Sequence, residues 1–273
     1  MIQGSTPDIY SDADGILLNN LGIRDPRLLE EAASVISEDN AALISNLPIL
    51  KIKEWSPEFY RDLHKALLGE IYPWAGEYRK IDVGIAFDNT AYEPWKNVEK
   101  KTADVFDYIR KKNLFRDMRT GDKIKNLALV FGTLKNIQPF RDGNTRTALL
   151  FTELLARNCG MAIDYSLIDK GDFAIAQLHA RDGDPTNLVL QFSIMTAPCN
   201  EMRHIKAPRI FADGQEHDIL QQVDAYGKWL ERDQQESKGQ DGIRSSLPKD
   251  GKKTRTQRIM DHHPTKPANG LER

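Results

Sequence analysis

Apolar residues recur every three or four positions through most of the first 200 residues, a spacing that predicts amphipathic helices. Asp25-Pro26 and Ser56-Pro57 each pair a capping side chain with a proline suited to the first helical turn, so helices are predicted to begin there. Further helices are predicted from 94 to 112, from 121 to 137, from 145 to 160, and near 172–181 and 184–196. The chain is therefore expected to be mainly α.

One segment follows a different pattern. Residues 77–95, EYRKIDVGIAFDNTAYEPW, alternate apolar and polar side chains around Asp88-Asn89. This alternation with a polar turn predicts a β-hairpin.

Composition changes after about Pro198. One amphipathic helix is predicted near 215–233, and apolar periodicity then ends. Residues 244–273 contain eight Lys/Arg and three Asp/Glu, a net charge of +5. Such a segment buries too little apolar surface to offset its ordering entropy, so a disordered basic tail is predicted. It could serve either as a solubilising tail or as a recognition or export signal.

The 273 residues are 40% hydrophobic and 29% charged, with a formal net charge of -2. These values are ordinary for a soluble globule and argue against non-specific nucleic-acid binding, so no nucleic-acid partner is predicted. No stretch is apolar enough to predict a membrane span or signal sequence, and a bacterial cytoplasmic location is expected. Two cysteines are too few for a disulfide framework or a zinc site.

The most informative string is IQPFRDGNTRTA, residues 137–148. Gly143 lets backbone N–H groups approach a ligand where the next helix begins, which predicts an anion site. Arg146 adds a guanidinium suited to phosphate, and Asp142 is an oxygen ligand suited to Mg²⁺ held between a carboxylate and nucleotide phosphates. Phe140 is expected to anchor this loop in the core.

The string resembles the motif of the Fic (Fido) family, His-Pro-Phe-x-[Asp/Glu]-Gly-Asn-Gly-Arg-x-x-Arg. Upstream, LHKALLGEIYPWAGEYRKIDV and NNLGIRDPRLLEEA are also similar to family segments, and the resemblance covers roughly residues 15–195. It implies a Fic-fold helical bundle with one β-hairpin flap. The predicted organisation is an N-terminal helical extension (1–45), a Fic core (46–198), a C-terminal helical appendage (199–236) and the basic tail (237–273).

The resemblance also implies an activity: most members transfer AMP from ATP to a hydroxyl of a target protein. It places Gln138 at the position of the catalytic base, Asp142 on Mg²⁺, and four residues on the nucleotide. The last four are Gly143, Asn144, Thr145 and Arg146. The target protein would bind at the flap, through Arg79, Lys80, Ile81 and Asp82.

Three positions depart from the family motif. Gln138 replaces the histidine, Thr145 the second glycine and Leu149 the second arginine. A glutamine amide cannot accept a proton near pH 7, and losing a positioned base costs roughly 10²–10⁴ in rate. The sequence therefore supports binding of ATP and Mg²⁺ more strongly than catalysis, and predicts an impaired or altered enzyme.

Two alternatives stay open. The Doc branch of the superfamily, which phosphorylates its target, also lacks the second glycine and second arginine, although Thr145 brings no positive charge and Doc retains the histidine. A non-enzymatic nucleotide- or peptide-binding pseudoenzyme is the other. The family's toxins and injected effectors further imply an antitoxin-like inhibitor as a separate partner and delivery into a host cell.

Two further features are interpreted as structural. Ser34 to Asp39 nearly fits the family's inhibitory helix motif, but an ordinary solvated helix face is favoured. His64, on the apolar face of its helix, is expected to pack and hydrogen-bond rather than bind a ligand.

Overall fold

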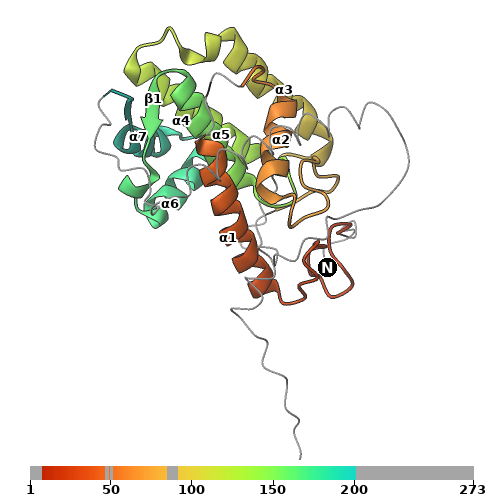
Figure 1. Ribbon diagram of the computed structural model, residues 1–273. Coiled ribbons are helices and arrows are strands. Elements are labelled where there is room, and N and C mark those ends of the chain that lie inside the picture. The colour runs from red at the N-terminus through yellow and green to blue at the C-terminus, as the bar shows by residue number, and fades with distance from the viewer. Residues whose placement is uncertain (1–7, 47–48, 50–51, 85–91, 201–273) are drawn as a thin grey trace, which may run out of the picture. The chain divides into compact units, whose positions relative to one another are not determined.

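The computed structural model describes residues 8–46, 49, 52–84 and 92–200, and helices carry most of them (Figure 1). The α-helices in these residues are α1 (Pro26–Ser45), α2 (Pro57–Leu68), α3 (Trp95–Lys111), α4 (Thr120–Ile137), α5 (Asn144–Asn158), α6 (Lys170–Arg181) and α7 (Thr186–Met195). Short 3₁₀ turns, η2 (Asn113–Phe115) and η3 (Tyr165–Leu167), lie between them. The predicted mainly α fold is confirmed, with helix starts within about two residues of the sequence prediction.

The predicted caps begin the first two helices. The Asp25 carboxylate accepts hydrogen bonds from the N–H groups of Arg27 and Leu28, and the Ser56 hydroxyl accepts one from Phe59. Pro26 and Pro57 occupy the first helical positions. At the C-terminal end of α5, Gly160 has a φ of 79°, a left-handed conformation that glycine adopts without strain.

The two helices that flank the motif loop form the centre of the described fold. In Figure 1, α4 and α5 lie in the middle, with α2 and α3 on one side and α6 and α7 on the other. Fully buried rings from α2, α3, the motif loop and α5 pack together: Tyr60, Phe106, Phe140 and Phe151, with contacting centroids 5.2–6.0 Å apart. Helix α1 packs against α2 and α5, so it belongs to the framework of the loop.

A small antiparallel sheet was not predicted. Strands β1 (Met161–Ile163) and β2 (Thr196–Pro198) pair with Ala162 opposite Ala197, and the Cys199 N–H donates to the Gly160 carbonyl. Strands of three residues, separated by two helices, are too short to show alternation. The pairing therefore arises from tertiary packing, which places the end of α7 beside the end of α5.

The predicted hairpin is described in part. The Tyr92 N–H donates to the Val83 carbonyl at 3.1 Å, which joins its two limbs. The turn at Asp88-Asn89 lies outside the described residues.

The described residues all fall within one compact unit, Met1–Ile210. The predicted subdivision at residues 45, 198 and 236 stays a prediction, and the helix near 215–233 and the basic tail lie outside the described residues. Within those residues, no helix has the length and apolar character needed to cross a bilayer.

Candidate functional site

The motif loop, residues 138–143, connects the end of α4 to the start of α5. Asn144 closes it: the Phe140 N–H donates to the Asn144 side-chain oxygen and the Asn144 amide donates back to the Phe140 carbonyl, both at 2.8 Å. The Phe140 ring is fully buried and stacks on His64 with centroids 3.8 Å apart. Phe140 is thus the predicted anchor, whereas the Asn144 side chain builds the loop instead of facing a ligand.

Gly143 is required for two reasons. Its φ of 75° is left-handed, and a Cβ there would lie 2.1 Å from Leu68 Cδ1 and 3.2 Å from His64 Nε2. Since Leu68 and His64 are both fully buried, neither can move aside easily. The glycine therefore lets the start of α5 lie directly against α2.

His64 fixes the loop as a neutral ring. The Gly76 N–H donates to Nδ1 at 2.9 Å, so the ring proton is on Nε2, which donates to the Asp142 carbonyl at 2.9 Å. Burial lowers the pKa of His64 from 6.5 to about 4, against a smaller raising effect of the Asp142 carbonyl. Both ring nitrogens are engaged, so His64 holds the loop, as expected, and has no lone pair for a substrate.

A cavity of about 180 Å³ opens at the start of α5, lined by Gln138 and the residues from Arg141 to Arg146. No side chain of the described residues caps this helix. In the described part of the chain, the N–H groups of Asn144, Thr145 and Arg146 have no hydrogen-bond acceptor. Unpaired donors and the positive end of the helix dipole make this cavity suited to an anion. Its size fits phosphate groups better than a whole nucleotide.

Arg146 and Asp142 face each other at the cavity. Arg146 Nη2 lies 3.6 Å from Asp142 Oδ2, and Nη1 donates to the Ser37 hydroxyl on α1 at 3.0 Å. Asp142 also accepts from the Gly143 N–H at 2.7 Å and the Tyr72 hydroxyl at 3.2 Å. Both charged side chains are about one third exposed, so a ligand can reach them.

Gln138 ends α4 with a φ of 48° and a ψ of 65°, a left-handed conformation. Its carbonyl accepts a 2.7 Å hydrogen bond from Arg79 Nε, and within the described residues its side-chain amide has no partner. The amide can therefore donate to or accept from a ligand, but it has no basic form near pH 7. Burial and the Asp142 charge raise the pKa of Tyr72 above its ordinary value, so its hydroxyl cannot replace the missing base.

Asp142 is the side chain best suited to a metal ion. Among the described residues, no three His, Cys, Asp or Glu side chains gather closely enough to hold a metal by themselves. Mg²⁺ usually binds one or two carboxylates and completes its shell with water and phosphate oxygens. One accessible carboxylate beside an anion cavity fits that arrangement.

The four predicted flap residues divide into two pairs. Lys80 and Asp82 are exposed, whereas Arg79 and Ile81 are buried. Arg79 donates to the carbonyls of Ile81, Glu93, Ile137 and Gln138, and its own N–H donates to the Pro139 carbonyl. The Arg79 side chain is directed into the protein, where it holds the loop and is not accessible to a partner. The sequence alternation that predicted the hairpin also contains this signal, since 79 and 81 share one face.

Residues 34–39, which nearly match the family's inhibitory motif, lie on α1 and contact the loop region through one serine. Glu38 accepts a hydrogen bond from Ser34 on its own helix; Glu38 is exposed on α1 and Ser34 is half-buried. It is Ser37, on the buried face, that reaches Arg146. Sequence reasoning missed this contact because it depends on how α1 packs on α5.

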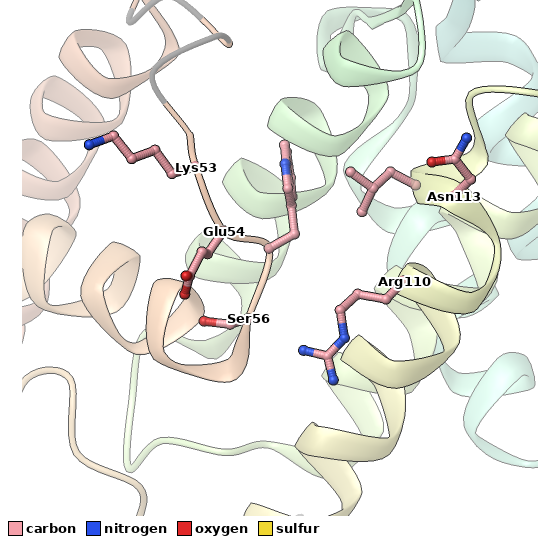
Figure 2. Close-up of a pocket in the computed structure, with 7 residues that line it drawn as sticks. Lys53, Glu54, Ser56, Arg110 and Asn113 are labelled. Atoms are coloured by element: carbon pink, nitrogen blue, oxygen red, sulfur yellow. The ribbon is translucent and has the colours of Figure 1, made fainter.

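A larger open hollow, of about 520 Å³, lies between the start of α2 and the end of α3. Figure 2 shows Lys53, Glu54 and Ser56 pointing away from Arg110, which belongs to the other wall. Its polar groups do not converge on a point, and it shares no residue with the loop cavity. The loop cavity is the better candidate site.

Comparisons with known proteins find relatives of this chain. Residues 54–156 match the Fic/DOC family. The protein adenylyltransferase VbhT of Bartonella schoenbuchensis is 26% identical over 183 residues, which are 67% of this chain and 37% of VbhT. The probable protein adenylyltransferase Fic of Escherichia coli is 26% identical over 199 residues, 73% of this chain and 96% of that protein.

A solved structure shares the fold. The N-terminal Fic domain of a VirB-translocated Bep effector protein from Bartonella quintana, with bound ADP, superposes with a TM-score of 0.65 and 23% identity, covering 70% of this chain and 96% of that one. The described residues form a helical domain in which a glycine loop precedes a central helix that has no side-chain cap among them. Residues 54–156 are a Fic-family domain, as the motif predicted.

Proposed function

We propose that this protein binds ATP at the start of α5 and descends from enzymes that transfer AMP to a target-protein hydroxyl, with transfer impaired or altered by Gln138. The observation that carries this proposal is the pairing of an intact anion cavity with an amide at the position of the family's base. Relatives that are named adenylyltransferases, and a similar structure with bound ADP, support the nucleotide and the type of reaction.

The N–H groups of Asn144, Thr145 and Arg146, with the Arg146 guanidinium, would hold the phosphates. Asp142 would hold Mg²⁺, which when bound neutralises phosphate charge. Gln138 could orient the target hydroxyl through its amide but could not take its proton, a loss of roughly 10²–10⁴ in rate. The residue set therefore favours binding and orientation over proton transfer.

The target protein would bind beside this loop, at the exposed Lys80 and Asp82, while Arg79 and Ile81 support them from below. A segment of the partner could add to the hairpin as a further strand. An effector role and delivery from a bacterial cytoplasm into a host are proposed from the VirB-translocated relative. A toxin role and a separate antitoxin-like inhibitor are proposed from the family resemblance of the motif alone.

The test is incubation with a cell lysate and ATP labelled separately on the α- and γ-phosphate, for the wild type and Gln138→His. The proposal predicts little α-label transfer by the wild type. Leu149 does not line the cavity, and it stands where the family motif has a second arginine, so one phosphate contact is missing. Misplacement of the phosphates can itself lower the rate by about 10². We therefore expect only a small gain from Gln138→His alone, and a larger one when Thr145→Gly and Leu149→Arg are added.

Other results would redirect the assignment. Transfer of γ-label without α-label would indicate the Doc-like phosphotransferase. No transfer by any variant, with ATP still bound, would indicate a binding protein. Efficient α-label transfer by the unaltered chain would contradict the proposed role of Gln138.

A further inference from the structure

Lys135, in the last turn of α4, does not line the loop cavity but contacts a residue that does. Its Nζ donates a 2.7 Å hydrogen bond to the hydroxyl of Thr145, which lines the cavity. Lys135 is half-buried, and within the described residues this is its one hydrogen bond. An ammonium has three donors, so two remain for another acceptor.

The charge of Lys135 is not balanced by a neighbouring carboxylate of the described residues. Arg141 pairs with Asp8 and Arg146 with Asp142, but in the described part of the chain no carboxylate pairs with Lys135. Burial alone lowers the pKa of Lys135 from its ordinary value. A partly buried cation without an anion is unfavourable, because burial disfavours the charged form.

The position of this charge adds to the imbalance. Thr145 is the second residue of α5, so the ammonium lies near the positive end of that helix, next to three unpaired N–H groups. A lysine in the last turn of α4 would be favoured by the dipole of its own helix, but that alone does not explain why it bonds to the start of α5. An anion in the cavity would balance both positive groups.

We infer that Lys135 and Thr145 form a second phosphate-binding pair, beside Arg146, for the polyphosphate of a nucleoside triphosphate. This inference rests on the proposed function and deepens it. Lys135 supplies the charge that threonine does not carry, and because the Thr145 oxygen accepts from Lys135, its hydroxyl hydrogen is free to donate to a phosphate oxygen.

The experiment is calorimetric titration of ATP and AMP, with Mg²⁺, into the full chain and four variants. Lys135→Met removes the charge and Lys135→Arg keeps it; Thr145→Val removes the hydroxyl and leaves the lysine. Lys125→Met is the matched control, since Lys125 is exposed on the same helix. Circular dichroism verifies that each variant is folded.

Lys135→Met is expected to weaken ATP binding by about tenfold or more, the usual effect of losing a charged hydrogen bond, with a smaller loss for AMP. Lys135→Arg and Lys125→Met should stay within about threefold of the wild type. Thr145→Val should lose less than Lys135→Met, since the ammonium remains.

Three results would overturn the inference. If the wild type binds ATP and Lys135→Met binds it equally well, Lys135 is not at the phosphates while the proposed function stands. If Thr145→Val and Lys135→Met lose affinity equally for ATP and AMP, the pair only shapes the loop. If the wild type binds neither nucleotide, the inference and the proposed function both fail.

Discussion

Gln138 combines an unusual backbone with a side chain that has no partner among the described residues. A φ of 48° is uncommon outside glycine, and histidine is one of the residues enriched there. Replacing Gln138 with histidine is therefore not opposed by the backbone. The loop geometry suits the residue that the family has, so the change at this position is one of chemistry and not of conformation.

Gly143 is the residue whose substitution tests the loop most simply. Gly143→Ala should lower the free energy of unfolding by about 2 kcal/mol or more, because its Cβ would overlap Leu68 in a left-handed backbone. Urea denaturation measures the change. Gly121→Ala, in the first turn of α4 with open space around it, is the control and should cost nothing. Equal stability of both variants would show that the contact at Gly143 can relax.

At the scale of elements, the segment after α2 is fastened to the end of α4 by one side chain. Arg79 is fully buried and satisfies four carbonyl groups, including those of Ile137 and Gln138. Since α4 ends in a left-handed residue, these bonds hold the turn that sets the direction of the loop.

Arg79→Lys should therefore lower the free energy of unfolding by about 3 kcal/mol or more, because lysine keeps the charge but leaves buried carbonyls unpaired. Thermal and urea unfolding measure the loss. Lys80→Met, at the exposed neighbouring position, should change stability by less than about 0.5 kcal/mol. Similar effects of the two substitutions would mean that the carbonyl contacts do not hold the turn.

Much of this arrangement could be read from the sequence. The caps at Asp25 and Ser56 and the periodic apolar stripes give helix starts, because these signals are local. The pairing of β1 with β2 could not be predicted, since it brings together segments more than 30 residues apart. The inward direction of Arg79 and the contact between Lys135 and Thr145 were missed for the same reason: both depend on how helices pack.

The site residues show the same division. The motif predicted that Gly143 and Arg146 shape an anion site, and the structure brings them to one cavity. It also predicted Asn144 as a nucleotide-binding residue; its side chain closes the loop, which leaves only its backbone N–H for that role. A motif identifies which residues matter, but the role of each depends on contacts that the spacing does not fix.

At the scale of the whole molecule, His64 links folding to pH. Its pKa falls from 6.5 to about 4 on burial, so between these pH values the unfolded chain binds a proton at this residue and the folded chain does not. Its contribution to stability is complete above about pH 6.5 and is lost as pH falls to about 4. Within this window the slope should approach about 1.4 kcal/mol per pH unit.

Unfolding free energies from urea titrations between pH 7 and 5 measure this slope. His64→Asn should be less stable at pH 7 and should lose less stability on acidification than the wild type. His179→Asn, at an exposed histidine, should give a curve parallel to the wild type. Parallel curves for the wild type and His64→Asn would show that His64 is not the group responsible.

The central claim is that the start of α5 is a working nucleotide-phosphate site even though the base is missing. Calorimetric titration of ATP with Mg²⁺ into the wild type and Arg146→Ala tests it most directly, with Arg27→Ala, an exposed arginine on α1, as the control. Heat of binding is expected from the wild type and Arg27→Ala and should be lost in Arg146→Ala. Absence of binding by the wild type at millimolar ATP, or equal binding by Arg146→Ala, would contradict the claim.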